Sequence, residues 1–239
     1  MKYQLYPLSD HAIVIELGKE ISDAIQQKIQ LVTSFLDDHS AEWMIAYIPA
    51  FTTVTIFYDS MKLSSFNKSD ELPYDQVCHY IDQFMSGLII DKQKESRIVE
   101  IPVCYGGELG PDLVHVAKSN GLTVEEVIHI HASGTYAVHM IGFAPGFPYV
   151  GGMSEKIATP RRASPRLKIP ARSVGIADSQ TGIYPIETPG GWQLIGRTPL
   201  QLFFPESYPP SLLKAGDKIC FKPITYQAYM KWGSEHADD

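Results

Sequence analysis

The sequence predicts an α+β protein, in which a small two-layer α+β domain precedes a β-barrel or β-sandwich domain. Up to residue 90, segments with helical periodicity alternate with short β-branched and aromatic segments. Residues 91–97 form a charged stretch without periodic apolar residues, and after residue 135 glycine and proline recur too often for long helices. These observations place the two domains at residues 1–90 and 98–239, joined by a linker at residues 91–97.

The first domain is expected to have the element order β-β-α-β-β-α. Residues 3–8 and 12–17 are short apolar segments typical of strands. Ser22 is a preferred N-cap residue, and the apolar residues after it are three and four positions apart, which predicts a helix. Residues 52–58 are β-branched and aromatic, as in a strand, and Pro73 is expected to begin a second helix. This order favours an antiparallel sheet with helices on one face.

The second domain is expected to begin with a strand at residues 98–103. A Gly-Pro pair at residues 110–111 and Gly121 are expected to begin and end a short helix. Thr123 and Glu126 have the spacing of a capping box, which predicts the start of another helix. Gly134 stands where that helix would end in a left-handed conformation. The rest of the domain consists of short strand-like segments separated by glycine and proline turns, as in a barrel or sandwich.

The charge is unevenly distributed along the chain. Twenty basic and 27 acidic residues give a net charge of −7, which argues against generic binding of nucleic acid or anionic membranes, because both need clustered positive charge. Residues 142–199, however, contain 9 of the 18 glycines, 8 of the 17 prolines and five of the six arginines, and their net charge is +4. The total charge therefore does not argue against a specific anion or an acidic protein surface as the ligand of this segment.

Several classes of protein are disfavoured by what the sequence lacks. No apolar run approaches the roughly 20 residues that span a bilayer, and the first residues lead into no signal-type apolar run, so we expect a cytoplasmic protein that does not bind membranes. The three cysteines are too dispersed for a disulfide framework or a zinc motif, so we expect free thiols and no metal. The standard phosphate-loop and dinucleotide-binding glycine motifs are absent.

Residues 159–172 are the strongest indication of a ligand site. They contain five cations, three prolines and no acidic residue. The prolines restrict the segment before anything binds, and arginine is favoured where a planar carboxylate or phosphate is bound through two hydrogen bonds. The segment is therefore interpreted as an anion site, or alternatively as a solvated basic loop. Two further glycine-rich loops, at residues 173–185 and 188–199, could converge with it on one pocket.

Aromatic residues and histidines offer further candidates, each with a structural alternative. Residues 142–152 combine flexible glycines with three aromatic rings, which fits either an apolar contact surface or a barrel corner with core aromatics. His139 lies near the end of a predicted strand and is either a proton carrier or a structural hydrogen-bonding residue. His129 and His131 are two residues apart on a predicted helix, so they cannot share a metal ion and are expected to be ordinary exposed or half-buried histidines.

Ordered motifs in this region resemble a known family. They are Gly-Phe-Ala-Pro-Gly-Phe-Pro-Tyr (142–149), Thr-Pro-Arg-Arg (159–162), Pro-Arg (165–166), Ser-Val-Gly-Ile-Ala (173–177), Gln-Thr-Gly-Ile-Tyr-Pro (180–185) and Pro-Gly-Gly-Trp-Gln-Leu-Ile-Gly-Arg-Thr-Pro (189–199). With residues 104–113, these motifs resemble the allophanate-hydrolase subunit 1-like family, also described as carboxyltransferase domain C and D. The family includes the B subunit of bacterial ATP-dependent 5-oxoprolinases and the inhibitor of a sporulation histidine kinase in bacilli, which the chain most resembles.

The resemblance implies a fold, an activity and partners. The second domain would be a cyclophilin-like β-barrel. The chain would be one subunit of a hetero-oligomeric hydrolase that converts 5-oxoproline, ATP and water to glutamate, ADP and phosphate, with ATP as a substrate of the assembled complex and no metal or biotin on this chain. Its partners would be a neighbouring-gene subunit of related fold, here named the C-type subunit, and a third oxoprolinase subunit. Alone it would be inactive and would inhibit autophosphorylation of a sensor histidine kinase.

The resemblance also assigns candidate roles to residues. Such hydrolysis needs cations near the substrate carboxylate and the developing phosphate charge. The candidate catalytic residues are His139, Arg162 and Arg197. The candidate substrate- or anion-binding residues are Arg161, Arg166, Gln180, Thr181, Gly190 and Gly191. The candidate partner-binding residues are Phe143, Pro145, Phe147, Tyr149 and Trp192. An alternative function is that of a subunit of an allophanate hydrolase or a urea-carboxylase-like carboxyltransferase.

Overall fold

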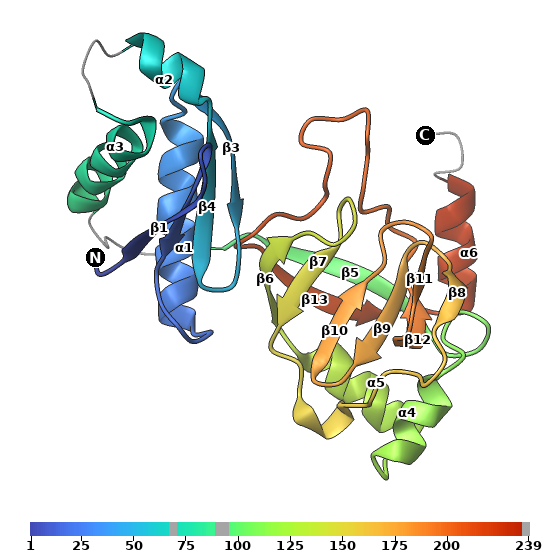
Figure 1. Cartoon of the computed structure of the whole chain (residues 1–239). Helices are drawn as coiled ribbons and strands as arrows, with labels where there is room; N and C mark the ends of the chain where they lie inside the picture. The colour runs from blue at the N-terminus through green and yellow to red at the C-terminus, as the bar shows by residue number, and fades with distance from the viewer. Residues whose placement is uncertain (67–70, 89–95, 236–239) are drawn as a thin grey trace. The chain divides into compact units, whose positions relative to one another are not determined.

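A computed structural model describes residues 1–66, 71–88 and 96–235 of the chain (Figure 1). The chain divides into two compact units, Met1–Glu95 and Ser96–Asp239. Most of the predicted linker at residues 91–97 lies outside the described residues. The mixture of helices and strands in both units confirms the α+β fold class.

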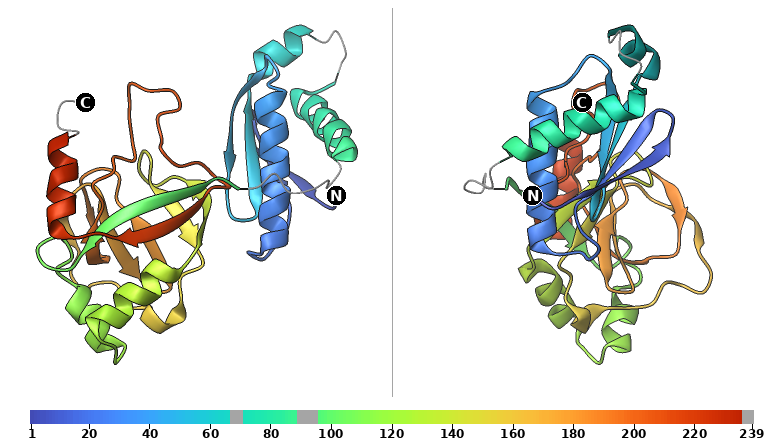
Figure 2. Two further views of the ribbon diagram at one scale, coloured as in Figure 1. Left: turned by 180° about the vertical axis from the view of Figure 1, so that it is seen from behind. Right: turned by 60° about the vertical axis from the view of Figure 1, so that its left-hand side comes forward.

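The first unit is a four-stranded antiparallel sheet with the strand order β1-β2-β4-β3. Helices α1 and α3 share one apolar core with strands β2 and β4, and the rings of Phe35 and Phe84 stack between the two helices with centroids 4.6 Å apart. Both helices therefore lie on one face of the sheet, as predicted (Figure 2). The elements are β1 (Gln4–Ser9), β2 (Ala12–Glu16), α1 (Asp23–Asp38), β3 (Met44–Pro49), β4 (Thr53–Tyr58), α2 (Ser60–Phe66) and α3 (Pro73–Gly87).

The second unit is built on a seven-stranded sheet with the order β10-β9-β12-β5-β13-β6-β7. Its two outermost strands, β10 and β7, lie beside each other, so the sheet nearly closes into a barrel (Figure 1). The elements are β5 (Ile98–Tyr105), α4 (Leu113–Ser119), α5 (Val124–Ser133), β6 (Tyr136–Ile141), β7 (Pro148–Gly151), the short 3₁₀ helix Glu155–Ile157, β8 (Arg166–Ile169), β9 (Ser173–Ala177), β10 (Gln180–Ile183), β11 (Thr188–Gly190), β12 (Gln193–Arg197), β13 (Lys218–Pro223) and α6 (Tyr226–Glu235).

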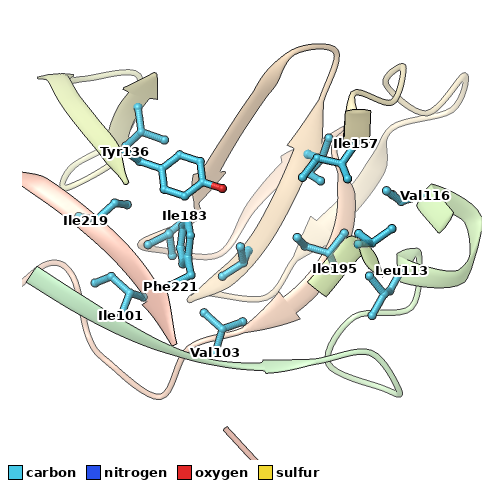
Figure 3. Packing of buried hydrophobic residues seen from close by; sticks show 14 of the residues in the cluster. Ile101, Val103, Leu113, Val116, Tyr136, Ile157, Ile183, Ile195, Ile219 and Phe221 are labelled. Carbon is cyan, nitrogen blue, oxygen red and sulfur yellow. The ribbon is translucent and has the colours of Figure 1, made fainter. Parts of the chain in front are cut away.

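Aliphatic and aromatic side chains from most of these strands fill the barrel (Figure 3). Val103, Ile195 and Phe221 come from three neighbouring strands and are fully buried. Leu113 of α4 and Val127 of α5 belong to the same cluster, so the two helices close the barrel with their apolar sides. This continuous core holds in place the loops that contain the basic and aromatic motifs.

Local helix signals were mostly predicted correctly. The Ser22 side chain accepts a hydrogen bond from the Ile25 amide, and Thr123 and Glu126 form both bonds of a capping box. Gly134 is an exception, because its φ of −74° is not left-handed. A Cβ atom at this position would lie 2.7 Å from the Tyr136 ring, so glycine is needed here for space and not for its conformation.

Candidate functional site

Two arginines of the basic segment converge on one buried carboxylate. Asp112 Oδ1 accepts hydrogen bonds from Arg162 Nη1 at 3.1 Å and from Arg166 Nη2 at 2.8 Å. Its other oxygen, Oδ2, accepts a bond of 2.7 Å from the Leu194 amide. One negative charge is therefore shared by two guanidinium groups, and the cluster keeps a net positive charge.

The positions of these residues follow from the strands that flank them. Asp112 occupies the N-cap position of α4, yet its side chain makes no capping bond and instead contacts the two arginines. The Arg162 amide donates to the Gly191 carbonyl at 2.7 Å, and the Gln193 side chain donates to the Pro160 carbonyl at 2.8 Å. The basic segment is thus held against the chain around β12, and it is not a freely solvated loop.

A small cavity of ≈ 160 Å³ lies beside this cluster and is lined by three cations. Arg166 begins strand β8, Lys168 follows two residues later, and Arg197 ends strand β12. The Arg197 side chain is oriented by a 2.8 Å hydrogen bond from its Nε to the Ala171 carbonyl. The remaining lining residues are Glu108, Leu109, Pro111, Pro170, Ser173 and Leu194.

A second, larger hollow is a weaker candidate for chemistry. It has a volume of ≈ 530 Å³ and lies between α5 and β13, where Ile128, Ala132 and Pro223 contribute to its walls. Its charged lining residues, Glu125 and Lys222, lie on the exposed rim, and no arginine of the basic segment lines it. We therefore regard the smaller cavity as the candidate site, since it holds a concentration of positive charge.

The structure brings some predicted site residues to the cavity and leaves others apart from it. Arg166 and Arg197 line it, and Arg162 is linked to it through Asp112. Arg161 points into solvent and pairs with Asp178 at 3.4 Å, where both side chains are exposed. Sequence analysis did not single out Asp112 or Lys168. The spacing of Lys168 from Arg166 could have indicated it, because side chains two residues apart on a strand point to the same face.

Gln180, Gly190 and Gly191 also lie outside the cavity lining. Gln180 is half-buried at the start of β10. Gly190 packs against Tyr184, where a Cβ atom would lie 2.7 Å from the phenol oxygen. Gly191 supplies the carbonyl that fixes the backbone of Arg162. In this arrangement the two glycines shape the loop that supports the arginines.

Thr181 belongs to a buried hydrogen-bond network around His131. The Thr181 hydroxyl donates to the Gly175 carbonyl at 3.0 Å and therefore accepts from His131 Nε2, which lies 2.8 Å away. His131 Nδ1 then accepts from the Tyr105 hydroxyl at 2.8 Å. Burial lowers the pKa of His131 to about 3, so the imidazole is neutral. His131 is fully buried, and the expectation of an exposed or half-buried residue was wrong for it.

His139 is buried in strand β6 and does not belong to the cavity lining. Its ring lies against the backbone of β7, because a Cβ atom at Gly151 would come within 2.2 Å of His139 Nε2. His139 therefore does not contribute to the cavity, and its role as a proton carrier remains a prediction.

The predicted partner-binding residues fall into two groups. Phe147 and Trp192 are buried in a small aromatic cluster with Tyr184, in which Phe147 lies edge-on to the other two rings at centroid distances of 5.7 and 5.9 Å. Tyr149 is half-buried, whereas Phe143 and Pro145 are exposed. Since buried rings are not available to a partner, the accessible part of the glycine-rich loop is its tip at Phe143 and Pro145.

Comparison with known proteins places the chain in a family. The family described as carboxyltransferase domain, subdomain C and D, matches residues 3–213, which is most of the chain. The chain belongs to the carboxyltransferase subdomain C and D family. This membership confirms the resemblance that the ordered motifs indicated.

Relatives of this family member cover nearly its full length. It is 47% identical over 236 residues to the 5-oxoprolinase B subunit of Bacillus subtilis (strain 168), covering 98% of both chains. The crystal structure of the uncharacterised protein PH0987 from Pyrococcus horikoshii is 42% identical, covers 95% of this chain and 100% of that one, and has a TM-score of 0.55. The crystal structure of TTHA0988 is 30% identical in sequence, with a TM-score of 0.74. The match covers 89% of this chain and 40% of the TTHA0988 chain.

Among the described residues, no helix has the length and apolar character needed to cross a membrane. Within the same residues, no group of three or more histidine, cysteine, aspartate and glutamate side chains is arranged to hold a metal ion. Cys78, Cys104 and Cys220 are all free thiols, as the sequence predicted.

Proposed function

We propose that this chain is the B subunit of an ATP-dependent 5-oxoprolinase, which converts 5-oxoproline, ATP and water to glutamate, ADP and phosphate. The observation that carries the proposal is the identity of 47% to a 5-oxoprolinase B subunit over 98% of both chains. Identity at that level over the whole length favours the same role in the same kind of complex. ATP is a substrate of the assembled complex in this proposal, and the C-type subunit and a third subunit complete it.

The cationic cavity is the proposed site for the carboxylate of 5-oxoproline. Its volume of ≈ 160 Å³ is far below the roughly 300–1,000 Å³ of pockets for drug-sized ligands, so it suits a small anion better than a nucleotide. Arg166 is already held by Asp112, and Lys168 pairs with Glu187 at 3.2 Å on the exposed surface. Arg197, whose Nε donates to the Ala171 carbonyl, is therefore the cation proposed to bind the ligand directly, through its terminal nitrogens. Arg162 would act indirectly, by positioning Asp112.

The chemistry assigns these cations an electrostatic role. Transfer of the γ-phosphoryl group from ATP to the lactam oxygen makes the lactam carbon electrophilic, and water then adds to that carbon. Breaking the carbon–nitrogen bond with protonation of the nitrogen leaves γ-glutamyl phosphate, and a second water hydrolyses this acyl phosphate to glutamate and phosphate. Cations that hold the substrate carboxylate fix the ring during these steps and offset the negative charge that gathers around it.

An assay of the three-subunit mixture tests the proposal. ATP-dependent formation of glutamate from 5-oxoproline should require this chain, and Arg197→Gln should lower kcat/KM by about 10- to 100-fold, the value of one charge-assisted hydrogen bond. Arg161→Gln is the matched control, because Arg161 is exposed and pairs only weakly with Asp178. Full activity without this chain would refute the proposed function, and an unchanged Arg197→Gln variant would refute the site.

We also propose inhibition of a sensor histidine kinase as a second activity of the chain when it is free of its partners. The exposed ring of Phe143 supports a protein-binding role for the glycine-rich loop. If the free chain is the inhibitor, adding the C-type subunit should restore kinase autophosphorylation. Kinase inhibition that persists in the presence of excess C-type subunit would contradict the proposal that only the free chain inhibits.

A further inference from the structure

A hydrogen-bonded hairpin projects from the barrel between β12 and β13 (Figures 1 and 2). Its two arms are joined by backbone hydrogen bonds, including Leu212 to Leu202 at 2.9 Å and Phe204 to the Pro210 carbonyl at 2.7 Å. Tyr208 lies at the tip and is 100% exposed. A large aromatic side chain held fully in solvent on a hydrogen-bonded, proline-rich hairpin is an unusual feature for a surface without a partner.

The glycine-rich loop between β6 and β7 packs directly beside the base of this hairpin. Gly146 has a φ of +78°, and a Cβ atom there would lie 2.9 Å from Phe203 Cβ and 3.3 Å from the Leu202 carbonyl oxygen. The two loops therefore meet at the base of the hairpin, although about 60 residues separate them in the sequence. We call the exposed part of both loops, residues 143–145 and 204–210, the two-loop surface.

The backbone of the glycine-rich loop holds a second aromatic ring in solvent. Phe143 is 69% exposed and has a φ of +67°, which is a strained conformation for a bulky residue. Hydrogen bonds from the Gly142 amide to the Phe147 carbonyl (3.0 Å) and from the Ala144 amide to the Gly142 carbonyl (2.8 Å) maintain it. The loop thus keeps an unfavourable backbone conformation, and the Phe143 ring touches the buried Phe147 ring edge-on, with centroids 5.4 Å apart, while most of its surface stays in solvent.

The two-loop surface is mainly apolar and rich in proline. Glu206 is the one charged residue among its ten. Pro145, Pro205, Pro209 and Pro210 stiffen the loops and add apolar contact area. A mainly apolar, proline-rich surface with exposed aromatic rings suits a protein partner with an apolar groove, and it is unsuited to a small anion or a nucleic acid.

We propose that the two-loop surface binds the companion subunit of related fold in the complex proposed above, with Tyr208 and Phe143 as its main contacts. The proposal rests on the proposed function for the identity of the companion. A companion protein is favoured because the fold also occurs within longer chains: the matched part of TTHA0988 is 40% of that chain. The same fold is therefore joined to further protein in a relative, and a separate chain needs a binding surface to achieve that association.

The test measures binding of the full-length chain to the purified C-type subunit by isothermal titration calorimetry. Tyr208→Ser and Phe143→Gly should each weaken binding about tenfold or more, as expected for aromatic residues at the centre of an interface. Tyr208→Ser should not lower the melting temperature, because Tyr208 is fully exposed. Phe143→Gly should change it little, because relief of the positive φ at residue 143 offsets the lost edge-on contact with Phe147. The Phe143→Gly variant therefore separates loss of the ring from loss of the fold.

Val114→Ser is the matched control. Val114 is 53% exposed on α4, at the end of the barrel opposite to the hairpin (Figure 1), and its substitution should leave binding unchanged. Binding of both loop variants within twofold of the wild type would overturn the proposal, as would a wild-type chain that does not bind the companion. Glutamate formation in the three-subunit assay without any dependence on Tyr208 or Phe143 would refute this inference and leave the proposed function intact.

Other occupants of the surface would give different results. A surface that joins two copies of this chain would show a wild-type dimer in light scattering that Tyr208→Ser converts to a monomer. A surface for the sensor kinase would show loss of kinase inhibition in both loop variants while companion binding stays the same. Either result would overturn the companion as the partner.

Discussion

Asp112 is the residue that determines how the basic segment is arranged. It is almost fully buried, and it accepts hydrogen bonds from Arg162, Arg166 and the Leu194 amide. Without its charge, two guanidinium groups would lie close together and would repel each other. The candidate anion site therefore depends on an acidic residue that lies about 50 residues before the arginines in the sequence.

Replacement of Asp112 by asparagine should destabilise the protein by roughly 3 kcal/mol, because it removes one partner of a buried ionic cluster. The free energy of unfolding in urea measures this loss. Asp178→Asn is the matched control, since Asp178 pairs with Arg161 on the exposed surface and asparagine tolerates its positive φ. That variant should differ from the wild type by less than about 0.5 kcal/mol. Similar losses in the two variants would contradict the central role of Asp112.

His131 makes the stability of the protein sensitive to acid. Burial lowers the pKa of His131 to about 3 in the folded state, against about 6.5 in an unfolded chain. Between these values the unfolded state binds more protons, so the stabilisation is complete above about pH 6.5 and is lost as the pH falls toward 3. Between these two pH values the free energy of unfolding should fall by up to about 1.4 kcal/mol for each pH unit of acidification.

Urea unfolding between pH 7 and pH 4 measures this dependence. His131→Gln should flatten it, because the glutamine amide can donate to Thr181 and accept from Tyr105 but does not titrate in this range. His129→Gln provides the comparison, since His129 lies two residues earlier on the same helix and is exposed. An equal slope in the wild type and His131→Gln would show that His131 is not the titrating group.

At the scale of elements, local signals were predictable and distant contacts were not. Ser22, Pro73 and the capping box at Thr123 act within one helical turn, so the sequence alone indicated them correctly. The need for glycine at position 134 comes from the Tyr136 ring after the chain has turned into β6. The order of the seven strands depends on pairings between segments far apart in the chain, such as β5 with β13, and it could not be read from short motifs.

Gly134→Ala should therefore destabilise the protein by overpacking. A methyl group would lie 2.7–2.8 Å from three atoms of the buried Tyr136 ring, and such overlaps typically cost about 1–3 kcal/mol. Gly87→Ala is the control, because nothing lies within 4 Å of its Cβ position near the end of α3. Alanine should be neutral there or stabilising by up to about 1 kcal/mol. Thermal unfolding of both variants measures the difference, and an equally stable Gly134→Ala variant would refute the steric explanation.

At the scale of the whole molecule, the candidate site combines parts that the sequence indicated separately. The sequence predicted an anion site from the arginines and prolines of residues 159–172, and the cavity contains Arg166, Lys168 and Arg197. The aromatic loop was open to two interpretations: Phe147 is buried, as the barrel-corner interpretation expects, and the exposed Phe143 leaves the contact-surface interpretation a prediction. Which residues of a loop face inward depends on the packing of the barrel, and composition carries little information about it.

Ligand binding should stabilise the second unit in particular, because the cationic cavity lies entirely within it. A ligand that binds the folded state alone stabilises it by about 2.7 kcal/mol at a concentration 100 times its dissociation constant. Excess 5-oxoproline should therefore slow hydrogen exchange in residues 96–235 and leave residues 1–66 unchanged. The lactam 2-pyrrolidinone, which lacks the carboxylate, should have no effect, and Arg197→Gln should abolish the protection while Arg161→Gln keeps it. If both lactams slow hydrogen exchange equally, the protein recognises the lactam ring, and the cations are not the binding site of the carboxylate.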